Sequence, residues 1–325
     1  ALRDLWHMRG QALAIALVIA SGIAMLVMSA ATLSSLQDTR DRLYRDYRFS
    51  DVWAQVKRAP SALAQRVAEL PGVNEVETRL IAGAKVELAD FYEPIEAVVQ
   101  SLPDTGEPAQ NRLYLRSGRM LAPFADDEVL VSESFALAHK LQPGDRLRAT
   151  VYGRTQWFTI VGMAVSPEYV YQIKPGAMFP DYQRYAILWM NRRALEAALD
   201  MNGAFNQVVV RLSPGADERD TIAAMDQLLA RNGSRGAHGR MDQLSYRFLH
   251  EEFRQLATMT RVFPTIFLGV AAFLLNVVFT RLVGTQRDQV AILKAFGYST
   301  LDVALHYGLI VTLICLIGSA LGVAG

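Results

Sequence analysis

Residues 250–254 come close to a zinc-protease motif. His250, Glu251 and Arg254 lie in the stretch HEEFR, where a metalloprotease has H-E-x-x-H. That chemistry needs two imidazoles one helical turn apart to hold Zn²⁺, with the glutamate as general base. Arg254 occupies the position of the second imidazole, so we predict a charged helix face here and not a metal site.

Other motifs of catalysis or nucleotide binding are missing from the sequence. It contains no G-x-x-x-x-G-K-[ST] phosphate loop and no G-x-S-x-G nucleophile elbow. The glycines of residues 233–239 lack a strand-to-helix context, so we predict a loop. A single cysteine, Cys315, excludes an intramolecular disulfide and a cysteine-based zinc site. We therefore predict no catalytic, cofactor-binding or metal site in this chain.

The composition predicts membrane spans together with a soluble domain. Of 325 residues, 51% are hydrophobic and 20% are charged, and 33 basic against 32 acidic residues give a net charge of +1. Such a balanced charge creates no global field to attract nucleic acid. The hydrophobic share is high for a soluble protein and low for one that is wholly embedded.

Three apolar stretches are predicted to cross a membrane: residues 12–34, 263–283 and 301–325. A span needs about 20 apolar residues, and one central charge would cost about 2.5–3.5 kcal/mol. The first stretch is longer than a signal-peptide core of about 7–15 residues, and a charged helical pattern follows it directly. We therefore predict an uncleaved span there. His306, near the start of the third stretch, is predicted to be interfacial.

The flanking charges predict the topology. Arg3 and Arg9 precede the first span, and Arg281, Arg287 and Lys294 follow the second. Basic flanks belong on the cytoplasmic side, so residues 1–11 and 284–300 are predicted to be cytoplasmic and residues 35–262 to lie outside. The chain starts without Met and stops in an apolar run, so we expect it to be incomplete, with further spans.

The outer region is predicted to be a mixed α/β domain with two subdomains built from discontinuous chain. Stalk helices are predicted at about 35–49 and 241–262, and irregular stretches at 103–111 and 232–239. An ordered loop is predicted from 168 to 185, with Glu168, Tyr169, Tyr171 and Tyr182 at a surface or hinge. Strands are predicted over 52–56, 73–88, 95–99, 128–131, 146–152, 155–165, 185–189 and 207–212, and helices over 61–70, 132–141, 192–199 and 217–231.

The stretch between the second and third spans, residues 284–300, has a helical pattern. Val290, Ile292, Leu293 and Phe296 form an apolar edge, and the opposite edge is polar. This pattern predicts a short amphipathic helix ended by Gly297. A tight connector carrying the usual positive charges is the alternative, and composition alone does not separate the two.

Residues 287–297, RDQVAILKAFG, resemble the pattern R-x-E-[IV]-[AG]-x-L-[KR]-A-x-G of the FtsX-like permeases, which include the MacB and LolCDE types of ABC transporter. Gln289 departs from the usual glutamate, which puts a charge-specific contact there in doubt. Residues 3–22 resemble the amphipathic entry of that family. Residues 128–133, 141–145 and 158–162 (EVLVSE, LQPGD and FTIVG) resemble its periplasmic core domain.

This resemblance implies an α-helical membrane protein with a large extracytoplasmic α+β domain, a MacB-like periplasmic core domain, on stalk helices. It implies a mechanotransmission permease in a bacterial inner membrane, working on a lipid, lipoprotein or amphipathic substrate. ATP and Mg²⁺ would bind a partner ABC ATPase subunit, expected in two copies, beside a second permease bundle in a homodimer, a heterodimer or one longer chain. A further extracytoplasmic partner or adaptor protein would fit. The ATPase-coupling residues implied are Arg287, Asp288, Gln289, Ile292, Leu293, Lys294, Ala295, Phe296 and Gly297.

Two other function classes stay open. One is a signalling scaffold of the FtsX division type, in which the outer domain regulates an envelope hydrolase. The other is a membrane-anchored enzyme, which would need a converging cluster of acid, base or metal ligands in the outer domain. We identify no such cluster from the sequence.

Overall fold

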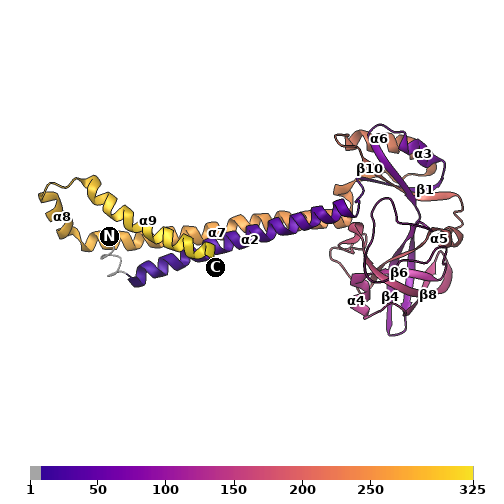
Figure 1. Cartoon of the computed structure of the whole chain (residues 1–325), viewed down its shortest axis with the longest axis horizontal. Helices are drawn as coiled ribbons and strands as arrows, with labels where there is room; N and C mark the ends of the chain where they lie inside the picture. Colours follow the sequence, from indigo (N-terminus) through magenta and orange to yellow (C-terminus); the bar gives the residue numbers. More distant parts are fainter. Residues whose placement is uncertain (1–8, 325) are drawn as a thin grey trace. The chain divides into compact units, whose positions relative to one another are not determined.

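The computed structural model describes residues 9–324, apart from the side chains of Leu282, Gln289 and Leu293. The predicted cytoplasmic entry at residues 1–11 therefore lies mostly outside the described residues. The chain forms two compact units (Figure 1): one is built from both ends of the chain, up to Thr39 and from Glu251 onward, and the other is Arg40–His250.

The first unit is helical. Its long helices are α2 (Arg9–Asp46), α7 (Leu244–Thr285) and α9 (Thr300–Ala324), and each is long and apolar enough to cross a membrane. Because about 20 residues suffice for a span, the 38 residues of α2 and the 42 of α7 exceed that need, and both helices continue into the second unit. Pro264 lies inside α7 without ending it.

Two glycines bring α9 close to α2. A Cβ atom on Gly318 would lie 2.8 Å from the carbonyl oxygen of Ala16, and one on Gly322 would lie 2.6 Å from that of Ala20. The G-x-x-x-G spacing permits this approach of two backbones. Ile314 is buried in the same cluster, so small and branched residues together form the contact.

The second unit contains two lobes. The first lobe is a four-stranded sheet in the order β11-β1-β10-β2, with all three pairings antiparallel. Val208, Val210 and Phe205 of β10 are fully buried in its core together with Met225 and Leu229 of α6. The elements are β1 (Val52–Pro60), β2 (Val73–Arg79), β10 (Ala204–Leu212), β11 (Ala237–Gly239), α3 (Leu63–Ala68), α6 (Glu218–Leu229) and η2 (Ala230–Asn232).

The second lobe is a seven-stranded sheet in the order β5-β8-β6-β9-β4-β3-β7. Because β7 pairs with both β3 and β8, six of these strands close on themselves. The pairs β4–β9 and β6–β8 are parallel. The strands are β3 (Ile81–Leu88), β4 (Phe91–Leu102), β5 (Tyr114–Gly118), β6 (Glu128–Ser132), β7 (Arg146–Val151), β8 (Arg154–Val165) and β9 (Tyr185–Asn191).

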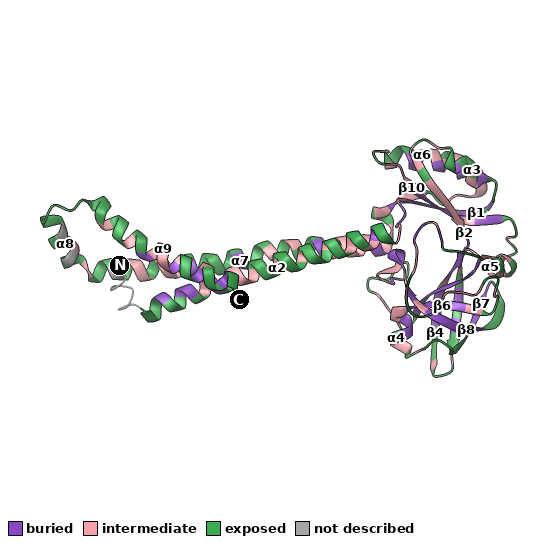
Figure 2. Cartoon of the chain, in the orientation of Figure 1, coloured by how far each residue is buried: buried purple, intermediate pink, exposed green. Residues whose placement is uncertain are grey.

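Two short helices complete the core of the second lobe. α4 (Glu133–His139) buries Phe135, and α5 (Arg192–Leu199) buries Leu195, among the inward-facing residues of β4, β6 and β9. Figure 2 shows the strands as the most buried part of this unit and the outer faces of the helices as exposed. Strands with both faces covered explain why β9, YAILWMN, is apolar almost throughout.

Some predicted elements were wrong. Residues 73–88 form two strands in different lobes, because the fully buried Leu80 between them crosses from one sheet to the other and bonds Ser101. β5 was missed, since most of its residues are exposed and give no alternation. The irregular stretch 232–239 ends in β11, a three-residue edge strand.

The three outer-domain motifs are structural. A Cβ atom on Gly162 would lie 2.6 Å from the carbonyl oxygen of Arg119, so the FTIVG stretch requires glycine there. Glu128 accepts the backbone N–H of Ala122 at 2.8 Å and pairs with Arg119. In LQPGD, Asp145 accepts the backbone N–H of Gln142 at 2.7 Å and so closes the turn.

Candidate coupling helix and outer-domain joint

A short helix, α8 (Arg287–Ala295), lies between α7 and α9. Gly297 follows it with φ +92°, and its N–H donates to the carbonyl oxygen of Lys294 at 3.1 Å. The N–H of Phe296 donates to the carbonyl oxygen of Ile292 at 3.1 Å. Glycine takes this left-handed conformation without steric cost, so α8 ends here and the chain turns before α9 begins at Thr300.

The start of α9 is fixed by its own side chains. Ser299 Oγ accepts the N–H of Asp302 at 3.2 Å, and a carboxylate oxygen of Asp302 accepts the N–H of Ser299 at 2.9 Å. This reciprocal capping box satisfies two N–H groups at the helix end. The hydroxyl of Tyr307 on α9 donates to Gln286 at 2.6 Å, which ties the residue before α8 to α9.

Two large apolar residues of this segment are exposed, and Val290 is half-buried. Ile292 is 55% exposed and Phe296 is 80% exposed. The charged residues Arg287, Asp288 and Lys294 are exposed beside them. Large exposed apolar side chains with a charged rim are typical of a surface that a protein partner covers.

The structure brings the described coupling residues together on one nine-residue helix and its C-terminal turn. Ala295 is also exposed. The side chains of Gln289 and Leu293 lie outside the described residues, so their part in the surface stays a prediction. The coupling role of the whole set is likewise a prediction.

The residues considered for catalysis lie in ordinary structural contacts. Glu251 pairs with Arg254 at 3.1 Å on α7, as expected of a charged helix face, and His250 stacks on Tyr246 with ring centroids 6.1 Å apart. His306 contacts the ring of Tyr307. Within the described residues, no three His, Cys, Asp or Glu side chains are grouped so that they could hold a metal ion.

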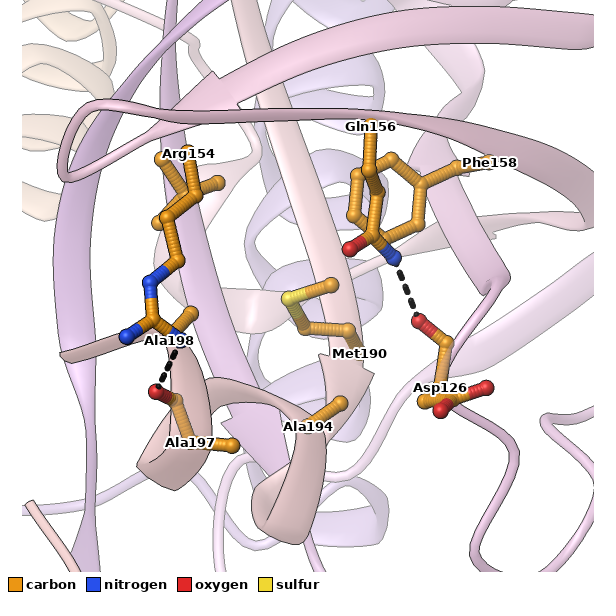
Figure 3. Close-up of a pocket in the computed structure, with 9 residues that line it drawn as sticks. Asp126, Arg154, Gln156, Phe158, Met190, Ala194, Ala197 and Ala198 are labelled. Atoms are coloured by element: carbon orange, nitrogen blue, oxygen red, sulfur yellow. Dashed lines mark hydrogen bonds between the residues drawn. The ribbon is translucent and has the colours of Figure 1, made fainter. Parts of the chain in front are cut away.

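A cavity of about 140 Å³ lies between α5 and β8 in the second lobe (Figure 3). Met190 and alanines of α5 line it. At its rim Arg154 donates to the carbonyl oxygen of Ala197 at 2.9 Å, and Gln156 donates to that of Asp126 at 2.8 Å. The lining therefore contains no nucleophile beside a base, and it supports no catalytic role.

An aromatic cluster forms the joint at which α2 and α7 enter the second unit. Tyr44 near the end of α2 stacks on Phe49, and Tyr246 near the start of α7 packs against both rings. Trp53 of β1 extends the cluster, and the guanidinium of Arg240 lies 5.1 Å from the centre of the Phe49 ring. The two helices therefore meet the first lobe through one packed set of rings.

Glu168 is buried, which corrects the prediction of a surface position and leaves that of a hinge untested. It belongs to η1 (Pro167–Tyr169) after β8, and it is 3% exposed, as Arg79 of β2 is 4% exposed. Arg79 Nη1 donates to Glu168 Oε2 at 2.7 Å, Nη2 donates to Oε1, and Nε donates to Gln207 at 2.7 Å. Burial alone would lower the pKa of Arg79, but the facing carboxylate raises it.

The sequence carried no signal for this pair. The two residues are 89 positions apart and belong to different lobes. Glu168 stands in the polar-looking stretch EYVYQ. Only the pairing of the two sheets brings its carboxylate to Arg79.

Two family models match the chain. One, described as the MacB-like periplasmic core domain, matches residues 10–228, and the other, described as the FtsX-like permease C-terminal, matches residues 261–325. These matches confirm the predicted fold class, helices that could span a membrane together with a large extracytoplasmic α+β domain. A search of curated proteins gives no match.

Two solved structures are similar to parts of the chain. The extracellular domain of the noncanonic ABC-type transporter YknZ from Gram-positive bacteria is 13% identical, covers 58% of this chain and 98% of its own, and gives a TM-score of 0.36. The periplasmic region of MacB from Actinobacillus actinomycetemcomitans is 9% identical, covers 65% of this chain and 95% of its own, and gives a TM-score of 0.37.

Proposed function

Because the chain belongs to the FtsX- and MacB-type family of ABC transporter permeases, we propose that it couples ATP hydrolysis by a separate ATPase subunit to work outside the membrane. Membership of this family implies a membrane-embedded permease with a periplasmic domain and an associated ATPase subunit. The exposed apolar surface of α8 carries the proposal for this chain.

Ile292 and Phe296 are the residues we assign to the contact with the ATPase. Both are large and more than half exposed, and they stand on a helix connected at each end to a helix that could span a membrane. Burying one such side chain against a partner contributes about 1.5–3 kcal/mol. We infer that a force on α8 would pass to α7 and α9, because each end of α8 is connected to one of these helices.

The orientation follows from the basic flanks. We place residues 284–300 and the N-terminus in the cytoplasm, and Arg40–His250 outside the inner membrane, because Arg281 precedes α8 and Arg287 and Lys294 belong to it. Two ATPase subunits would then work on this bundle and a second permease bundle.

We infer that ATP and Mg²⁺ are bound by the partner and that this chain supplies no catalytic group. The absence of a phosphate loop from the sequence supports this inference. The work outside is proposed to be export or extraction of a lipid, a lipoprotein or another amphipathic molecule.

Gentle purification of the full-length membrane protein tests the proposal. We expect an ABC-type ATPase to co-purify in stoichiometric amount, and we expect Ile292→Asp with Phe296→Asp to reduce it at least tenfold, because a carboxylate must be desolvated at the contact. Leu137→Asp is the matched control, since the exposure of Leu137 lies between those of Ile292 and Phe296 but Leu137 lies on α4 of the outer domain. Co-purification of an envelope hydrolase without an ATPase would instead favour the scaffold of the FtsX division type.

A further inference from the structure

The side chain of Glu168 is hydrogen-bonded to residues of three different strands. Its Oε1 accepts the indole N–H of Trp53 at 2.7 Å, and its Oε2 accepts a hydrogen bond from Gln100 at 3.3 Å. With Arg79, these partners come from β1 and β2 of the first lobe and β4 of the second. This buried carboxylate therefore bridges the two lobes, as do the hydrogen bonds of Asn206 to Ile81 and of Arg192 to Thr78.

The same segment is bonded to the start of α7. Gln243, the residue before α7, donates from its side chain to the carbonyl oxygen of Glu168. Ser245 Oγ accepts the N–H of Tyr171 at 3.0 Å, and the ring centroids of Tyr171 and Phe248 lie 4.8 Å apart. The first turn of α7 and the residue before it are therefore in direct contact with residues 168–171.

A buried ion pair is suited to a joint that opens. Taking two charges out of water costs several kcal/mol per ion, and their attraction repays that cost only with good geometry and further hydrogen bonds. When such a joint opens, both charges regain their hydration. The planar guanidinium of arginine donates two parallel hydrogen bonds to a carboxylate, and this geometry also fixes a single closed arrangement.

We propose that the Arg79–Glu168 pair is a releasable latch: the outer domain has a second state in which the start of α7 draws Glu168 away from Arg79 and the two lobes turn apart. The closed state is the arrangement in this structure, with Arg79 bonded to Glu168. That α7 is driven by an ATPase rests on the proposed function, but the existence of the two states does not.

The latch is tested by an inter-lobe distance in the full chain, reconstituted in lipid nanodiscs without any ATPase. Spin labels are placed at exposed positions, Arg66→Cys on α3 and Leu137→Cys on α4, with Cys315→Ser removing the native thiol. We expect one main distance, with a second state below about 10%.

Glu168→Gln keeps the shape of the side chain and removes its charge. It removes the carboxylate to which Arg79 is hydrogen-bonded in the closed state only, while Glu77 remains as a nearby charge, so we expect the open-to-closed ratio to rise about 100-fold. Glu133→Gln is the matched control, because it breaks the exposed Arg116–Glu133 pair and leaves the joint intact. Its distance distribution should equal that of the parent.

If Glu168→Gln does not fold, a second variant still tests the latch. Glu168→Asp keeps the charge, but its shorter side chain places the carboxylate farther from the guanidinium of Arg79. We expect the population with the longer inter-lobe distance to rise less than in Glu168→Gln. A folded Glu168→Gln or Glu168→Asp chain with the single parental distance overturns the latch. So does loss of the folded domain in both variants, which would assign the pair to folding alone. None of these outcomes bears on ATPase binding.

Discussion

Tyr44 and Phe49 stack with their ring centroids 4.4 Å apart where α2 ends in the second unit. Tyr44 is buried, and among the described residues its hydroxyl has no hydrogen-bond partner. A buried polar group without a partner costs about 1–3 kcal/mol. The aromatic cluster through which α2 reaches the outer domain therefore contains a buried hydroxyl, that of Tyr44, without a hydrogen-bond partner among the described residues.

Removing that hydroxyl should stabilise the outer domain. We expect Tyr44→Phe to raise the free energy of unfolding by about 1 kcal/mol, because the ring stack is kept and the orphan hydroxyl is lost. Denaturant unfolding of the full chain in detergent, followed by the fluorescence of the buried Trp53 and Trp189, measures the change. Tyr152→Phe, at an exposed turn, should have no effect. A less stable Tyr44→Phe chain would show that the hydroxyl is bonded.

Gly162 should tolerate no side chain. A Cβ atom there would lie 2.6 Å from the carbonyl oxygen of Arg119 and 3.0 Å from side-chain atoms of Leu115 and Leu130. We expect Gly162→Ala to lower the free energy of unfolding by about 1–3 kcal/mol through this overpacking. Gly83→Ala in β3 is the control, since nothing lies within 4 Å of its Cβ position. Equal unfolding midpoints for the two variants would contradict the close approach of Arg119 to Gly162 of β8.

Glu77 should weaken the outer domain at neutral pH. Burial raises the pKa of its carboxyl, although the backbone N–H of Gln110 opposes the shift. A folded-state pKa above the unfolded value of about 4.3 means that stability increases as the pH falls from neutral through the folded-state pKa. Glu77→Gln should therefore be more stable than the parent at pH 7 and should lose that advantage near pH 4. An advantage independent of pH would contradict the shift.

The contribution of Glu128 to stability should depend on pH in the opposite direction to that of Glu77. The hydrogen bond from Arg119 lowers the pKa of its carboxyl, so its contribution is present above about pH 4.3 and is lost as the pH falls through the folded-state pKa. Because Arg119 is half exposed, we expect Glu128→Gln to cost less than about 1 kcal/mol at pH 7. Thermal unfolding at pH 7 and pH 3 checks this. A loss that persists at pH 3 would indicate a cause other than charge.

The local features of the fold were accessible from the sequence. Helix α5 coincides with the predicted residues 192–199, because the preceding apolar strand and the following polar turn mark both of its ends. Gly297 marks the end of α8 for the same reason. These features depend on neighbours within a few residues.

The long-range features were not accessible. The double pairing of β7 with β3 and β8 closes the second lobe, and it depends on the register of three strands that any alternating pattern allows. Burial of Glu168 likewise depends on Trp53 and Arg79, which are 115 and 89 positions away. Charge in a loop normally indicates exposure, and here the packing of two sheets overrides it.

We propose that α8 binds an ABC ATPase. A photo-reactive phenylalanine analogue at Phe296, irradiated in intact cells that carry the full-length protein, tests it directly, because Phe296 is 80% exposed at the end of that helix. We predict one main cross-linked product that contains an ABC ATPase, and none when the analogue is placed at Tyr152 of the outer domain. Cross-links from Phe296 only to lipid or to the chain itself would contradict the claim and return α8 to a connector between two membrane helices.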